Sequence, residues 1–194
     1  MDFQDVVRRR RMVRAFRRDP VPPEVVERIL DNGRRAPSAG HTQGWAFLVL
    51  EGADTERFWN ATFEDRSGFK WPGLFLAPLL IVPLSHRQAY LERYAEPDKG
   101  WTDQDEARWP VPYWHIDTGF AAMLMQLTAV DAGLGCLFFG IFKTEAFRRA
   151  FGIPDEYTPI GALAVGWPAE DRPSASVSRG RRPLPSVVHR GGWS

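Results

Sequence analysis

The chain has 194 residues, 44% of them hydrophobic, which is enough for one domain with a core and too short for two comfortable ones. Its 25 basic residues (22 Arg and three Lys) nearly balance 24 acidic ones, and a net charge of +1 excludes a strong overall field for attracting nucleic acid. A single cysteine, Cys136, excludes an internal disulfide and a multi-cysteine metal site. The four histidines lack the i, i+4 spacing of a zinc pair, so no metal is expected.

The N-terminus shows none of the features of a secretory signal, because MDFQDVV has an acid at position 2 and no long apolar core. The longest apolar stretch, residues 74–84, is too short to cross a bilayer and is interrupted by prolines. We therefore expect a soluble, cytoplasmic protein with no membrane partner.

The first half of the chain predicts two helices, then strands and a helix in alternation. Apolar spacing predicts a helix from Phe3 to about Arg10, with Asp2 as its N-cap. A second helix begins at the proline pair 22–23 and must end near Pro37. Further on, the pattern predicts strands over 45–52 and 79–85, a helix over 54–63 and a loop over 63–73. Pro83 in the second strand indicates a sheet edge or a bulge.

The second half continues this alternation. A short helix is predicted over 87–94, and the polar segment 96–113 has no clean period, which is typical of a functional or mobile loop. Residues 115–133 give the clearest helix, and its apolar residues nearly encircle it, which indicates burial in the core or at a subunit interface. Strands 135–142 and 159–168 enclose a helix 145–151 capped by Thr144, and the class is α+β or α/β.

The arginines near the N-terminus are the first candidate site. Arg8–Arg11 are followed by Arg14, Arg17 and Arg18, and three interpretations compete. A nucleic-acid patch lacks interleaved aromatics and a recognised binding module. A solvated charged face is the ordinary interpretation. A phosphate site is the third, if a break in the helix between Arg10 and Arg14 turns the side chains inward.

Two loops are weaker candidates when each is taken alone. The segment APSAGHTQGW, residues 36–45, leaves a helix for a strand and exposes backbone N–H groups to a ligand, or is simply a connecting loop. The segment GLGCLFFG, residues 133–140, lacks the full spacing of a dinucleotide fingerprint, and its Cys136 resembles a buried thiol. His115 and Asp117 are two positions apart and would not face one way on a helix, so no catalytic dyad is expected there.

The order of these segments is more specific than any one of them. RRMVRAF (10–16), the loop 36–45, the strand 133–140, PIGALAVGWP (159–168) and RRPL (181–184) together resemble the nitroreductase superfamily over nearly the whole chain, least over 54–112. The resemblance implies an α+β fold with a central, mostly antiparallel sheet flanked by helices, in an intertwined homodimer. It also implies a single domain, 1–194, whose residues 169–194 form an arm extending onto the partner subunit.

The same resemblance implies an FMN site at the subunit interface. The flavin phosphate would meet Arg10 and Arg14, with Arg11 nearby, and Arg181 or, as second choice, Arg182 from the arm. The residues matching the loop that lines the flavin ring and ribityl chain are Pro37, Ser38, Ala39, His41 and Gln43. Phe139 and Gly140 match the positions whose main chain approaches flavin N5.

The implied activity is transfer of electrons from NAD(P)H through FMN to a nitroaromatic, quinone or similar flat acceptor by a ping-pong mechanism. Cofactor chemistry of this kind needs no side-chain acid or base. Three positions depart from the family pattern: Met12 replaces serine, His41 replaces asparagine and Gly44 replaces proline. The alternatives are a specialised metabolite dehydrogenase, oxidase or deazaflavin user, and a non-catalytic flavin- or nucleic-acid-binding protein.

Overall fold

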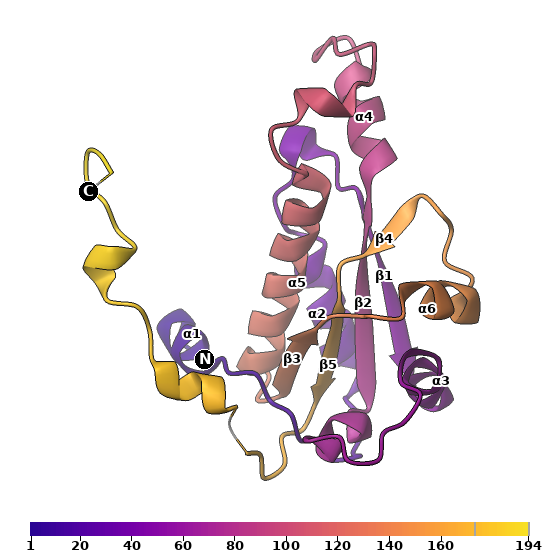
Figure 1. Cartoon of the computed structure of the whole chain (residues 1–194), viewed down its shortest axis with the longest axis vertical. Coiled ribbons are helices and arrows are strands. Elements are labelled where there is room, and N and C mark those ends of the chain that lie inside the picture. The colour runs from indigo at the N-terminus through magenta and orange to yellow at the C-terminus, as the bar shows by residue number, and fades with distance from the viewer. Residues whose placement is uncertain (173, 194) are drawn as a thin grey trace.

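An antiparallel sheet organises the chain in the computed structural model, which describes residues 1–172 and 174–193 (Figure 1). Its strands are β1 (Trp45–Glu51), β2 (Leu79–His86), β3 (Gly135–Phe139), β4 (Tyr157–Pro159) and β5 (Ala162–Gly166). The order is β1-β2-β5-β3, and β4 pairs with β2. Every pairing of these strands is antiparallel, which confirms the expected α+β class.

The helices lie close to the predicted ranges. They are α1 (Phe3–Arg9), α2 (Pro23–Gly33), α3 (Ala53–Thr62), α4 (Arg87–Ala95), α5 (Tyr113–Asp131) and α6 (Thr144–Phe151). Asp2 caps α1 as predicted, because its carboxylate accepts the N–H of Gln4 at 2.9 Å. The predicted cap of α6 was wrong by one position, because Thr144 is the first helical residue and Lys143 is the cap.

The two faces of the sheet follow the two-residue period of its strands. On β2, Leu80, Val82 and Leu84 belong to a core beneath α3 and α6, whereas Leu79 and Ile81 belong to a second core beneath α2 and α5. Neighbouring strands keep this alternation, as expected when side chains point to opposite faces in turn. The sheet is therefore buried on both faces between two helical layers (Figure 1).

Pro83 lies on the inner strand β2, so the predicted edge was wrong, but the predicted alternative, a bulge, is confirmed: between the two ladders on one side of β2, residues 82–83 stand opposite three residues, 160–162. Its register with Phe47 on β1 is continuous from Trp45 to Glu51. On its other side, β2 pairs with β5 over residues 79–81 and with β4 over 84–86, and Pro83 falls between the two ladders. Its carbonyl accepts the N–H of Ile160 on that side, where its missing N–H interrupts neither ladder.

The predicted strand 159–168 is divided into β4 and β5. Gly161 lies between them with φ 149°, and a Cβ there would stand 2.8 Å from the carbonyl oxygen of Phe139. Glycine is therefore required by both the backbone angle and the close approach. The strand predicted to reach residue 142 ends at Phe139, so Gly140 lies just beyond the sheet.

Two half-buried tryptophans, Trp101 and Trp109, attach the otherwise exposed segment 96–113 to its neighbours. Trp109 lies among Tyr94 and Trp101, with ring centroids 4.5 and 5.5 Å away, and next to Tyr113 and Trp114. Edge-on aromatic contacts of this kind stabilise a cluster beyond simple burial. The segment therefore forms an aromatic cap against α4 and the start of α5.

The chain beyond the sheet forms two short 3-10 turns, η4 (Ala175–Arg179) and η5 (Leu184–Ser186). Figure 1 shows this yellow segment leaving the sheet and ending away from it. Its large apolar side chains are exposed to solvent: Leu184 is 69% and Trp193 is 92% exposed. Pro173 and Ser194, which also belong to the predicted arm, lie outside the described residues.

Across residues 1–172 and 174–193, no helix combines the length and the apolar character needed to cross a membrane.

Candidate functional site

The arginine segment, residues 10–14, runs along the edge of β3. Met12 forms a parallel bridge with Cys136, and the N–H of Val13 donates to the Cys136 carbonyl at 3.1 Å. Val13 is buried in the core while Arg10 and Arg14 are half-buried. The edge pairing thus fixes the backbone of the segment in an extended form after α1 ends, as the predicted break required.

Arg14 is held from several directions. Its Nη1 donates to the Met12 carbonyl at 3.0 Å, and its guanidinium lies over the Trp71 ring, 5.1 Å from the centroid. A cleft of about 450 Å³ opens beside it, and its charged lining residues besides Arg14 are Lys70, Glu170, Asp171 and Arg172. Three cationic side chains therefore line the cleft against two acidic ones, and the excess of positive charge suits an anion such as a phosphate.

A buried carboxylate lies in the same place. The side chain of Asp171 is 2% exposed, and its Oδ2 accepts the Arg14 backbone N–H at 2.8 Å and Arg11 Nη1 at 3.3 Å. Its Oδ1 is buried without a partner among the described residues. Arg11 therefore forms an ion pair with Asp171, and the cations that remain to face the cleft are Arg14, Lys70 and Arg172.

The loop of residues 37–43 contains the second group of expected site residues. It turns through η1 (Ala39–His41), and Gly40, His41 and Gln43 have φ values of 60°, 54° and 53°. Left-handed backbone at a residue other than glycine costs about 1–3 kcal/mol and concentrates at functional sites. The loop is tied internally, because the N–H of Gln43 donates to Ser38 Oγ at 2.9 Å and its side-chain amide contacts His41 Nε2 at 3.0 Å.

A buried acid on α5 anchors this loop. Asp117 is 2% exposed, and its Oδ2 accepts the Ala39 N–H and the Tyr90 hydroxyl, both at 2.8 Å. Burial raises the pKa of Tyr90, and the hydrogen bond to Asp117 raises it further. The phenol therefore stays protonated and remains a donor to the carboxylate.

Gly44, one of the departures from the family pattern, is explained by the same packing. A Cβ at this position would stand 2.5 Å from the Tyr90 ring, and the Gly44 carbonyl accepts the N–H of His86 at 2.9 Å. The loop therefore passes directly over Tyr90, where any side chain would collide with the ring.

At the end of β3, Phe139 and Gly140 present main-chain atoms rather than side chains to the surface. The Phe139 ring stacks on Trp59 at 5.4 Å inside the core. Gly140 is exposed, and a Cβ built on it would have nothing nearer than Phe142 at 3.7 Å. The backbone at 139–140 is thus open to a flat ligand, and Phe142 beside it is 97% exposed.

The described chain does not bring all the expected site residues together. The loop 37–43 is bound to Asp117 in the first turns of α5, whereas the arginine segment pairs with β3, after α5 has ended at Asp131. Fourteen residues of helix at ~1.5 Å each separate these ends by ~21 Å along the axis. Arg181 and Arg182 are exposed on the yellow segment away from the sheet (Figure 1).

The other reactive side chains have structural partners. Burial raises the pKa of the Cys136 thiol to about 12, and the charge of Arg10 offsets only part of this. Ser85 Oγ donates to the Thr158 carbonyl at 3.2 Å, so it accepts from His115 Nδ1 at 2.8 Å. Cys136 is thus the buried thiol that the sequence predicted, and His115 and Asp117 bind different partners, as expected for residues that form no dyad.

Comparison with known proteins assigns the chain to a family. A sequence profile described as the Nitroreductase family matches residues 7–167. The chain belongs to the nitroreductase family.

The chain is also similar to individual proteins. The chain is 29% identical to a 5,6-dimethylbenzimidazole synthase of Rhodospirillum rubrum, over 92% of this chain and 89% of that protein. It is 25% identical to an NADPH-dependent oxidoreductase of Staphylococcus aureus, over 95% of this chain and 71% of that protein. A nitroreductase-like protein of Exiguobacterium sibiricum in complex with FMN superposes with a TM-score of 0.75 and 21% identity, covering 100% of this chain and 98% of the other. This structural likeness establishes the nitroreductase fold.

Several residues of the site were missed by the sequence analysis. Tyr90 and Asp117 hold the loop, while Lys70, Asp171 and Arg172 surround the cleft beside Arg14. Asp117 could have been found, because an acid inside a helix that is apolar nearly all round needs a buried partner. Asp171 gave no such signal, since it lies in a polar segment.

Proposed function

We propose that this member of the nitroreductase family is an FMN-dependent NAD(P)H oxidoreductase that acts as a homodimer, with each flavin site shared between two copies. The observation that carries the proposal is the separation of the site residues. The arginine segment and residues 139–140 share β3, while the loop 37–43 lies at the other end of α5. A second copy in the opposite orientation would supply the loop that one chain cannot bring to its own arginines.

The residues present fit a flavin. Arg14, Lys70 and Arg172 offer charge-assisted hydrogen bonds to a dianionic phosphate, and Arg11 neutralises the neighbouring Asp171. The open backbone at Gly140 suits the edge of a flat ring. FMN in the related Exiguobacterium structure supports the choice of this flavin. Arg10 would add to the phosphate site from the same segment, and Arg181 or Arg182 would reach it from an arm, residues 169–194, laid on the partner subunit.

When bound, FMN would supply the chemistry of hydride acceptance from NAD(P)H and of electron transfer to a flat acceptor such as a nitroaromatic or quinone. The protein binds and orients the flavin through the arginines, the loop and the backbone at 139–140. Its likeness to an NADPH-dependent oxidoreductase supports a nicotinamide donor. Neither Cys136 nor His115 is needed as a catalytic group, and the proposed mechanism is ping-pong, with donor and acceptor using one site in turn.

The test begins with the purified full chain. Flavin absorbance, or uptake of added FMN, should be followed by anaerobic bleaching with NADH or NADPH and by recovery when a quinone or nitroaromatic is added. Steady-state rates at several acceptor concentrations should give parallel double-reciprocal lines. A chain that takes up no FMN, or a bound flavin that neither nicotinamide reduces, would contradict the proposal.

A second candidate is a specialised flavoenzyme that converts one metabolite. The identity of 29% to 5,6-dimethylbenzimidazole synthase, over 89% of that protein, favours it. If the flavin binds but passes electrons to quinones and nitroaromatics no faster than free reduced FMN does, this candidate replaces the first.

A further inference from the structure

Side chains on one face of α4 contact the loop 37–43 from its outer side. Tyr90, Arg93 and Tyr94 follow the i, i+3, i+4 spacing that places side chains on the same side of a helix. Tyr90 donates to Asp117 beneath the loop, and a Cβ on Gly40 would stand 2.9 Å from the Tyr94 ring. All three side chains of this face therefore meet the loop or its anchor.

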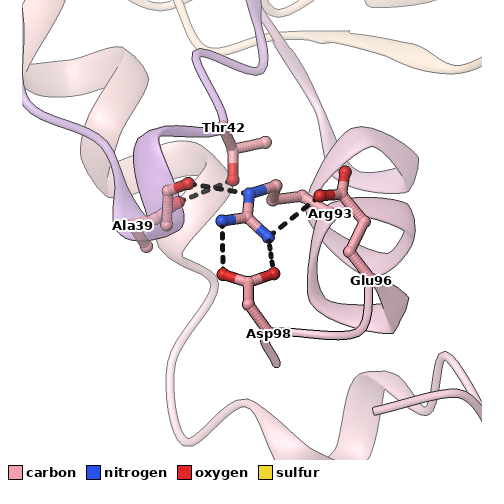
Figure 2. A network of polar contacts seen from close by, with 6 residues as sticks. Ala39, Thr42, Arg93, Glu96 and Asp98 are labelled. Carbon is pink, nitrogen blue, oxygen red and sulfur yellow. Dashed lines mark hydrogen bonds and ion pairs between the residues drawn. The ribbon is translucent and has the colours of Figure 1, made fainter. Parts of the chain in front are cut away.

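Arg93 makes the most specific of these contacts. Its Nε donates to the Gly40 carbonyl at 2.9 Å, while Nη1 and Nη2 bind the two oxygens of Asp98 at 2.7 and 2.8 Å (Figure 2). Glu96 adds a third contact to Nη1 at 3.2 Å. With both terminal nitrogens of its planar guanidinium paired to Asp98, Arg93 directs its Nε–H at the loop.

Two opposite charges therefore hold adjacent residues of one strained turn. The buried Asp117 carboxylate accepts the N–H of Ala39, and the Arg93 guanidinium donates to the carbonyl of Gly40. The left-handed residues follow at once, at His41 and Gln43. Because backbone in this region persists only where its surroundings hold it, the two contacts reinforce from outside the shape that the internal hydrogen bonds of the loop set.

The aromatic cap stabilises the arrangement from behind. Tyr94 packs against Trp101 and Trp109, and the N–H of Trp101 donates to the Tyr94 carbonyl at 2.8 Å. Asp98 lies in the turn between Tyr94 and Trp101, so packing of the cap also sets the position of the carboxylate that locks Arg93.

We propose that Arg93, locked by Asp98, is a positioning residue that preorganises the loop 37–43 for the flavin ring and ribityl chain. This inference rests on the proposed function for its ligand, although the order of the loop can be measured without one. It also gives the segment 96–113 a role, because the aromatic cap in this segment supports a binding loop. Preorganisation lowers the ordering cost of binding, so its loss should appear as weaker affinity.

The first experiment is hydrogen exchange on the flavin-free full chain. Arg93→Met should speed exchange of peptides covering residues 37–45 by about tenfold, because it removes a charged hydrogen bond to the loop. Arg87→Met is the matched control, since Arg87 lies on the same helix and pairs with Glu106 at 2.8 Å without touching the loop. If Arg93→Met folds poorly, Asp98→Asn replaces it, because Asp98 is exposed. This variant should speed exchange of the loop peptides by an intermediate factor. Equal exchange in Arg93→Met and Arg87→Met would overturn the inference.

The second experiment separates the loop from the phosphate site by titrating FMN and riboflavin. Arg93→Met should weaken both ligands by a similar factor, about tenfold, whereas Arg14→Ala should weaken FMN alone because riboflavin has no phosphate. Faster loop exchange with unchanged affinity for both flavins would also overturn the inference. If the parent chain binds neither flavin, the proposed function fails, and the exchange measurement still decides whether Arg93 orders the loop.

Discussion

Asp171 accepts the backbone N–H of Arg14 at 2.8 Å, across 157 positions of sequence. This one bond attaches the chain just beyond the sheet to the arginine segment at its edge. The neighbouring residue Ala169 donates its N–H to the Ala15 carbonyl at 3.0 Å and strengthens the same attachment. The place where the C-terminal segment leaves the sheet is therefore also the wall of the proposed phosphate site.

Replacing Asp171 should therefore destabilise the fold. Asp171→Ala leaves the Arg14 N–H without its acceptor, and an unsatisfied buried group costs about 1–3 kcal/mol. The free energy of urea unfolding should fall by that amount. Asp155→Ala is the control, because Asp155 is fully exposed and pairs with Arg148 only at the surface. Equal losses in the two variants would show that the Asp171 bond contributes little.

Arg14→Ala should weaken FMN binding by about one to two decades, since a charged hydrogen bond contributes about 1.5–3 kcal/mol. Arg10→Ala and Arg181→Ala should have smaller effects of the same sign. Quenching of flavin fluorescence during titration measures each affinity. Arg28→Ala, on the exposed face of α2, should leave binding unchanged. If all three site variants bound FMN as the parent does, the phosphate assignment would be wrong.

Cys136→Ala should keep its flavin and most of its turnover. The thiol is buried with a pKa of about 12, so it is neutral at physiological pH and cannot act as a nucleophile. Removal of one buried heavy atom should cost about 0.5–1.5 kcal/mol of stability. Loss of turnover in a folded, flavin-loaded variant would reveal a thiol step.

The fold was largely predictable from the sequence because strand and helix periods are local properties. Pro83 was predictable in part: the sequence indicated a bulge, but not that the bulge lies on an inner strand, where β5 gives way to β4 along β2. The arginine segment and the loop were found as motifs, but the sequence could not show that they lie at opposite ends of α5. Nor could it explain Gly44, whose small size is set by Tyr90, a residue 46 positions away in a different element.

His115 should make stability depend on pH. Burial lowers its pKa, and Glu106 offsets only part of this; the other charged groups lining the same cleft are Arg87, Asp155 and Glu156. The unfolded chain, with a histidine pKa of about 6.5, therefore binds more protons than the native one just below that pH. The contribution of His115 is complete above about pH 6.5 and is lost as the pH falls toward the lowered value.

His115→Asn tests this dependence, because its amide can still donate to Ser85 Oγ while it cannot titrate. Between about pH 8 and pH 5.5, urea unfolding should show a smaller loss of stability in the variant than in the parent. Identical losses in the two proteins would assign the pH dependence to other groups.

The last prediction concerns assembly, and it begins with surface that one chain leaves uncovered. On α5, Phe120 and Met123 are 47% and 43% exposed, and a groove of about 410 Å³ runs between α1 and α5. Beyond the sheet, the exposed apolar side chains are Leu184, Val187, Val188 and Trp193. If two copies pack through α5 and each arm crosses its neighbour, both sets of side chains are buried together.

Deleting residues 179–194 should then lower dimer stability and flavin occupancy in parallel, because the deletion removes part of the interface and Arg181 at once. Light scattering over a dilution series and flavin absorbance per chain measure the two quantities. The full chain is measured first, and a stable monomer that still binds FMN would exclude a site shared between copies. Arg181→Ala separates the two roles of the arm: it should lower flavin affinity while the dimer remains. A truncated dimer with unchanged flavin affinity would reduce the arm to a packing element, and the phosphate would then be held by the arginine segment and the cleft beside it.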